Sequence, residues 1–175
     1  METQTKLDFS EAFKDTPRPS WNLKMQKELV NKTATIIQEW SRTSTSQISF
    51  DDCAQMIEQV LKYDTLDDGF ELAKEFEEYG LAPDSELVSI LDSVYLIKHQ
   101  IKKDWIKKWV TTAKLELKLN IGTSATIKIP PHGIQKVDIV ELYPDTLQYG
   151  VWAPILGYQK GKGHRIINAE KIETK

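Results

Sequence analysis

The chain has 175 residues, 40% of them apolar, and a formal net charge of −3. A chain of this length can bury a core without disulfides or metals, and its single cysteine, Cys53, excludes an internal disulfide and a multi-cysteine zinc site. The acidic balance excludes a globally basic nucleic-acid coat, although it leaves room for a local basic patch.

The first half of the chain carries the apolar spacing of helices. Prolines at positions 17 and 19 disfavour helix before them, so we expect residues 1–19 to form a flexible arm that joins the fold near Ser20. Ser20 is the predicted N-cap of a first helix, whose apolar positions recur every three or four residues: Met25, Leu29, Thr33, Ile36 and Trp40. Ser49 and Asp52 resemble a capping box and predict the start of a second helix, with Cys53 in its apolar stripe.

Two further helices are predicted before residue 113. Thr65 and Asp68 repeat the start signal, and Gly80 is a natural residue to end the third helix. The apolar stripe of that helix consists of Phe70, Ala73, Phe76 and Tyr79. A fourth helix is expected from about Pro83 to about Thr112, and its length allows either a kink or a run between domains.

After Thr112 the apolar period changes from that of a helix to that of a strand. Leucines alternate with polar residues over 114–121, which favours a half-buried strand, although Leu, Lys and Glu equally suit a continuing helix. Four short strands are then predicted, with Pro- and Gly-rich turns between them: Ala125–Ile129, Val137–Leu142, Leu147–Trp152 and Arg165–Ile167. A short turn is expected before Lys171 and Ile172.

The number and spacing of these strands resemble an SH3-like barrel, without any motif that carries the resemblance. The predicted fold class is therefore α+β. We expect a helical domain of four helices over residues 20–112, followed by a small SH3-like β-barrel domain over residues 113–175.

The sequence contains no constellation typical of a catalytic or metal site. The three histidines lie far apart, without the i, i+4 spacing that places two imidazoles on one helix face, and no nucleophile or phosphate-loop motif occurs. Cys53, in an apolar stripe, is more typical of a small buried side chain than of a nucleophile. The segment Asp64–Glu75 has the Gly and Glu spacing of a calcium loop, but Leu66 occupies a ligand position. We expect no enzyme activity, no cofactor and no metal.

Lysines dominate residues 98–118, where seven of them accompany two acidic residues. Four of these lysines stack on a predicted helix surface and are called the lysine stripe: Lys98, Lys102, Lys103 and Lys107. Trp105 and Trp109 lie among them. The lysine stripe could bind phosphates. The alternative, which we favour, is a solvated helix face whose lysines cover tryptophans packed in the core.

A second candidate surface belongs to the predicted barrel. Aromatic residues gather around one strand pair, and such clusters on small barrels form peptide-binding grooves: Tyr149, Trp152 and Tyr158. Strand alternation places Tyr149 and Trp152 on opposite faces, so at least one should point away from the core. The adjacent basic loop offers Lys160, Lys162 and Arg165 to a phosphate, to an acidic partner or to solvent.

These features predict a non-enzymatic binding or adaptor protein that acts through protein–protein contacts, with an acidic face on the partner. The alternative is a nucleic-acid-binding accessory protein that uses the lysine stripe and the basic loop, which would require both clusters to face one side. No apolar run is long enough to cross a membrane, and the acidic amino end lacks the apolar stretch of a secretory signal, so the cytosol is the expected compartment.

Overall fold

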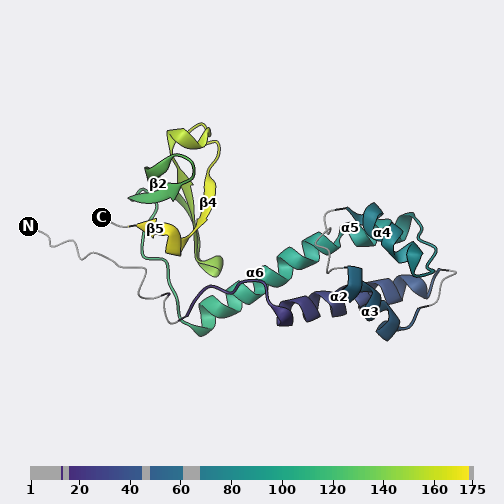
Figure 1. Cartoon of the computed structure of the whole chain (residues 1–175). Coiled ribbons are helices and arrows are strands. Elements are labelled where there is room, and N and C mark those ends of the chain that lie inside the picture. The colour runs from purple at the N-terminus through teal and green to yellow at the C-terminus, as the bar shows by residue number, and fades with distance from the viewer. Residues whose placement is uncertain (1–12, 14–15, 45–47, 61–67, 174–175) are drawn as a thin grey trace, which may run out of the picture. The chain divides into compact units, whose positions relative to one another are not determined.

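The computed structural model describes residue 13 and residues 16–44, 48–60 and 68–173. The chain divides into a helical unit, Ser20–Asp104, and a sheet unit composed of Met1–Pro19 and Trp105–Lys175. The division falls within helix α6 (Val94–Thr112), which contributes residues to both units. The predicted α+β class is confirmed, because the helices come first and an antiparallel sheet follows (Figure 1).

The described part of the helical unit contains four helices before α6: α2 (Leu23–Ser41), α3 (Phe50–Val60), α4 (Gly69–Glu78) and α5 (Ser85–Asp92). Helix α2 packs mainly on α3, and α4 packs mainly on α5. The largest buried side chains of this unit include Met25 and Leu29 from α2, Phe76 from α4 and Leu87 from α5. The predicted stripe of the first helix is confirmed at Met25, Leu29, Thr33 and Trp40, but Ile37 is buried there instead of Ile36, which is half-buried.

Short polar side chains start the helices as the sequence indicates, with one shift. Asn22, not Ser20, caps α2, and its side-chain oxygen accepts hydrogen bonds from the amides of residues 24 and 25. The amide of Asp52 donates to the Ser49 hydroxyl at 3.1 Å, which confirms the predicted start of α3. Asp68 caps α4, and Gly80, at φ +84°, follows the end of that helix. Thr65 lies outside the described residues.

The predicted fourth helix is two helices, α5 and α6, separated by Ser93. The Ser93 hydroxyl donates to the carbonyl of Ile90 at 2.6 Å. It thus competes for this carbonyl with the backbone amide that would bond to it in a continuous helix. Asp92 uses its Oδ1 to accept the amide of Gly69 at 2.8 Å. A Cβ on Gly69 would approach the Asp92 amide nitrogen to 2.5 Å, so only glycine allows this junction between α4 and α5.

The predicted apolar stripe of α4 is only half right. Ala73 and Phe76 are buried, but Phe70 is 56% exposed and Tyr79 is 47% exposed. The buried face of α4 is rotated toward Gly69 and Leu72, because Gly69 is the contact point with α5.

The sheet unit contains five antiparallel strands: β1 (Ser124–Ile129), β2 (Gly133–Tyr143), β3 (Gln148–Trp152), β4 (Arg165–Asn168) and the two-residue β5 (Ile172–Glu173). Their order across the sheet is β4-β3-β2-β1-β5. The four predicted strands therefore exist, and the short turn expected before residue 172 is the 3₁₀ turn η4 (Ala169–Lys171). No helix within the described ranges is long and apolar enough to span a bilayer.

The predicted closed barrel is wrong, because the sheet is open, with β4 and β5 at its two edges. β4 and β5 follow each other directly in the sequence and are joined by η4. They do not pair with each other through backbone hydrogen bonds, so the sheet is not closed. The chain from Asn168 to Ile172 reaches at most ~14 Å. A flat sheet would separate its first and fifth strands by ~19 Å. The sheet must therefore curl.

The strand predicted over residues 114–121 is also wrong, and the helix does not continue there. Lys114, at φ +52°, ends α6, and the amide of Leu115 reaches back to the carbonyl of Val110 at 3.0 Å. Leu115, Leu117 and Leu119 are half-buried and alternate with exposed residues, as predicted. The amides of Lys118 and Leu119, however, both donate to the Tyr149 hydroxyl at 3.0 Å instead of to a neighbouring strand.

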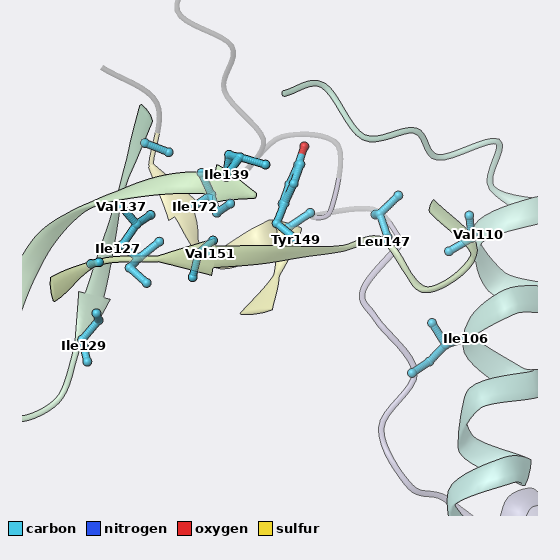
Figure 2. Packing of buried hydrophobic residues seen from close by; sticks show 13 residues of the cluster. Ile106, Val110, Ile127, Ile129, Val137, Ile139, Leu147, Tyr149, Val151 and Ile172 are labelled. Atoms are coloured by element: carbon cyan, nitrogen blue, oxygen red, sulfur yellow. The ribbon is translucent and has the colours of Figure 1, made fainter. Parts of the chain in front are cut away.

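The core of the sheet unit surrounds Tyr149 (Figure 2). Ile127, Val137, Ile139 and Val151 from the strands are buried, and Ile106 and Val110 from α6 belong to the same cluster. Figure 2 shows the Tyr149 ring standing on its strand with the hydroxyl at the far end, where the two amides of the 113–121 segment meet it.

Candidate functional site

The register of the sheet defines the face that lies opposite this core. Residues directly across an antiparallel pair share a face, so Trp152 lies on the same side as Asp138 and Ser124. Gly150 likewise shares this side with Glu141 and Ile166. We call this side the outer face. The predicted alternation is confirmed, because Tyr149 is fully buried in the core while Trp152 is half-buried on the outer face.

The loop of residues 153–164 between β3 and β4 folds back over Trp152. The indole N–H of Trp152 donates to the carbonyl of Tyr158 at 2.9 Å, and the Lys160 ammonium lies 4.9 Å from the ring centroid of Trp152. Lys160 also approaches Asp138 Oδ2 at 3.3 Å, while Ser124 donates to Asp138 Oδ1 at 2.9 Å. The Ser124 hydrogen bond, assisted by Lys160, lowers the pKa of the Asp138 carboxyl. Trp152 is thus held in a defined position.

Two glycines let the loop lie directly on the sheet and on itself. A Cβ on Gly150 would come within 2.8 Å of His164 Cδ2, so the imidazole of His164 covers bare backbone. A Cβ on Gly163 would come within 2.8 Å of Tyr158 Cδ1, so the ring of Tyr158 covers the second glycine. Any larger side chain at either position would displace the loop.

The end of the loop is fixed by three polar side chains. His164 Nε2 lies 2.9 Å from the Tyr143 hydroxyl and 3.1 Å from Glu141 Oε2. The hydrogen bond to Glu141 raises the pKa of the Tyr143 hydroxyl, because the carboxylate stabilises the protonated form. The side chain of Glu141 is about half exposed, so this group is a surface clamp rather than an enclosed acid–base pair.

Apolar and basic side chains are exposed beside this clamp. Tyr158 is 45% exposed, Ile155 is 44% exposed and Ile166 is 50% exposed. Lys162 and Arg165 are exposed as well. We call the following residues the outer-face surface: Trp152, Tyr158, Lys160 and Ile166.

The sequence singled out only part of the outer-face surface. The structure brings together the side chains of Trp152 and Lys160 and the backbone carbonyl of Tyr158. Tyr149, in contrast, belongs to the core. Sequence reasoning missed Ile166 and the supporting Asp138. Ile166 could have been found by alternation, since its neighbour Ile167 packs on the core. Asp138 could not, because a register shift lies between Ile139 and Glu141.

The lysine stripe is distributed over both units. Lys98, Lys102 and Lys103 belong to the helical unit and Lys107 to the sheet unit. The ammonium of Lys98 lies 5.5 Å from the Trp21 ring centroid, and that of Lys107 lies 3.2 Å from Asp145 Oδ2.

The tryptophans within the lysine stripe are half-buried. Trp109 packs against the sheet core and donates to the carbonyl of Thr16 at 3.2 Å. Trp105 is half-buried too.

Open grooves lie elsewhere in both units. A groove of about 560 Å³ in the sheet unit is lined by Lys107, Leu117 and Asp145 among others. A groove of about 540 Å³ in the helical unit lies between α4 and α5, beside the exposed Phe70.

The structure places the candidate metal ligands and the single cysteine as follows. In the part of the chain that the structure describes, no group of three His, Cys, Asp or Glu side chains could hold a metal. Residues 64–67 of the calcium-loop pattern lie outside the described residues, and Asp68 caps α4 instead. Cys53 is fully buried, and burial raises the pKa of its thiol to about 12.

Comparison with known proteins provides no relative: no family model matches the chain, and no curated protein or solved structure is significantly similar to it.

Proposed function

We propose that this chain is a non-enzymatic binding protein that holds a partner protein against the outer-face surface, as an adaptor does. The observation that carries the proposal is the fixed Trp152, with the exposed Tyr158 in the loop that folds over it and the exposed Ile166 on β4. Tryptophan and tyrosine contribute most to protein interfaces when they are already ordered before binding, since little conformational entropy is then lost.

Charge supports a partner with an acidic face. Lys162 is exposed in the loop, and Lys160 neutralises Asp138 on the outer face. Arg165 pairs with Val151, so it leaves β4 on the other side of the sheet, but it is exposed at the edge of the sheet. Carboxylates at the rim of a partner would meet these cations, which would speed association and favour the correct orientation.

The SH3-like character of the sheet remains part of this proposal. This is supported by the end of the chain, where the 3₁₀ turn η4 separates β4 from β5. β4 pairs with β3 at one edge of the curled sheet, and β5 pairs with β1 at the other. A curled sheet with a long loop over one face is the type of scaffold on which small binding modules present aromatic side chains.

Nucleic-acid binding through the lysine stripe and the basic loop has weaker support. Three of its lysines already have intramolecular partners: Lys98 with Trp21, Lys107 with Asp145 and Lys160 with Asp138. Each such contact must be broken or shared before the cation can neutralise a phosphate. Retardation of labelled DNA or RNA by the full chain at low salt, lost when Lys102, Lys103 and Lys162 are replaced by Gln, would favour this alternative.

The proposal is tested by partner retention on the immobilised full chain, with extract from the native cell. Tyr158→Ser and Ile166→Ser should each reduce the recovered partner at least about tenfold, as expected for side chains central to an interface. Leu96→Ser is the matched control, because Leu96 is 66% exposed and belongs to the helical unit. Circular dichroism verifies that all variants are folded. Equal recovery with all three variants would contradict the proposal.

A further inference from the structure

Strand β4 is an edge of the sheet, and the hydrogen-bond pattern shows which of its backbone groups face outward. The amide of Ala169 donates to the carbonyl of Leu147 at 3.0 Å, which continues the β3–β4 register by one pair. Hydrogen-bonded pairs alternate along an antiparallel ladder, so Arg165 and Ile167 direct their backbone groups to β3. The N–H and C=O groups of Ile166 and Asn168 therefore point to the free edge.

β4 is short, at four residues, and carries the exposed Arg165, but no other part of the described chain covers its outward backbone groups. Within the described ranges, no turn, loop or helix provides a backbone hydrogen bond to Ile166 or Asn168. The side chain of Asn168 is occupied by Gln148, whose Nε2 lies 2.9 Å from Asn168 Oδ1, so it does not cover the edge. Natural sheets normally cover, shorten or charge their edge strands, because unpaired backbone groups recruit other strands.

The charges around the edge select the chemistry of the occupant. Arg165, Lys162 and Lys171 are exposed. The nearest carboxylate in the sequence, that of Glu170, is held by the Arg18 guanidinium at 2.6 Å. Glu141, half exposed on the outer face, adds one carboxylate 3.1 Å from His164, so the three exposed cations still leave the surroundings of β4 net basic. A second copy of the chain would bring another Arg165 and Lys162 to the same place, whereas an acidic strand would neutralise them.

We propose that β4 accepts an extended acidic segment of the partner protein as an added strand, bonded to the backbone groups of Ile166 and Asn168. This inference rests on the proposed protein-binding function and specifies its mode. The main-chain bonds hold the segment, and the exposed side chains of Tyr158 and Ile166 contact its residues on the outer face.

A random 12-residue peptide library displayed on phage, selected on the immobilised full chain, provides the probe. The most enriched sequence is then synthesised and added to the ¹⁵N-labelled full chain. We expect acidic residues to be enriched in the selected peptides. At 90% saturation, amide exchange at Ile166 and Asn168 should slow about tenfold, because only the free tenth exchanges at the original rate. The amide of Ile167, already bonded within the sheet, should change little.

Two matched variants test the role of the backbone. Ile166→Pro removes the outward N–H without removing a bond to β3, a substitution that edge strands tolerate. Ile166→Val keeps that N–H and a similar side chain. Peptide binding should weaken at least about tenfold in Ile166→Pro and less than about threefold in Ile166→Val. Methylation of alternate peptide nitrogens, which leaves the protein unchanged, should abolish binding in one of the two alternations, because only one set of peptide N–H groups faces β4.

The outcomes separate this inference from the proposed function. Selected peptides that bind without protecting Ile166 and Asn168 overturn strand addition, and the proposed function then stands or falls by partner retention. A selected set without acidic enrichment, or no selected peptide at all, also overturns it. Protection of the two amides in a dimer of the chain without peptide would show that the occupant is a second copy, which contradicts the inference.

Discussion

Replacing Tyr149 by Phe removes one oxygen atom and leaves the ring that fills the sheet core. That oxygen accepts hydrogen bonds from the amides of Lys118 and Leu119, both at 3.0 Å. A typical hydrogen bond contributes about 0.5–1.5 kcal/mol net, and a buried donor left without a partner costs more. With two donors affected in a partly buried segment, we expect Tyr149→Phe to lower the free energy of unfolding by about 2 kcal/mol, which corresponds to a Tm decrease of about 4–8 °C for a chain of this size.

Urea unfolding followed by circular dichroism measures the loss, and Tyr158→Phe is the control. The Tyr158 side chain is 45% exposed, so loss of its hydroxyl should change the free energy of unfolding by less than about 0.5 kcal/mol. Amide exchange at Lys118 and Leu119 should accelerate in Tyr149→Phe alone. A variant within 0.5 kcal/mol of the unmodified chain, with those two amides still protected, would refute the argument that the hydroxyl anchors residues 113–121.

The same substitution has a pH signature. Burial raises the pKa of the Tyr149 hydroxyl, and the two amide bonds only partly oppose this. The folded state therefore keeps the phenol proton at a pH where the unfolded state has lost it. Stability from this group is complete below the unfolded pKa of about 10 and declines as the pH rises above it. Tyr149→Phe should remove this contribution to the alkaline slope.

Three further predictions concern other parts of the chain. Arg18→Gln should lower the free energy of unfolding by about 2–3 kcal/mol in urea, because it breaks contacts to Glu170 and to two backbone carbonyls, and a loss below 0.5 kcal/mol would contradict this. Thr33→Val should raise it by about 1 kcal/mol, since the buried Thr33 hydroxyl has no partner in the described ranges, whereas Thr35→Val should not. Burial raises the pKa of the Cys53 thiol from 9.0 to about 12, so the folded chain keeps this proton at a pH where the unfolded chain has lost it. The free energy of unfolding should therefore decline between these two pH values. In Cys53→Ala, unfolding measured as a function of pH should show a flatter decline.

The elements of this fold were predictable wherever the deciding residues are neighbours in sequence. Ser49 and Asp52 form the start of α3 within four residues, and Gly80 ends α4 through its own backbone conformation. The exposure of Phe70 was not predictable, because it depends on how closely Gly69 approaches Asp92 in another helix. The alternation over residues 114–121 indicated the correct half-buried leucines, but the partner of their amides is a side-chain oxygen about 30 residues away.

The candidate site shows the same limit. Alternation along β3 predicted that Trp152 and Tyr149 face opposite ways, since that information lies within one strand. The residues that fix Trp152 come from other strands. Asp138 reaches it only through a register that shifts within β2, and Lys160 reaches it through a loop that two glycines allow to fold back. Long-range pairing of this kind carries no local sequence signal.

The contact between Arg18 and Glu170 joins residues 152 positions apart, and it closes the sheet unit around an insertion of the whole helical unit. On the ribosome, the segment that bears Arg18 emerges early, yet its binding site at Thr146, Leu147 and Glu170 is synthesised last. The helical unit can therefore fold before residues 105–175, with which the first segment of the sheet unit must pack, have been synthesised. A fragment that begins at residue 105 would lack Arg18 and its contacts to the sheet unit. An isolated sheet unit must therefore keep residues 16–19 and connect them to residue 105 by a linker.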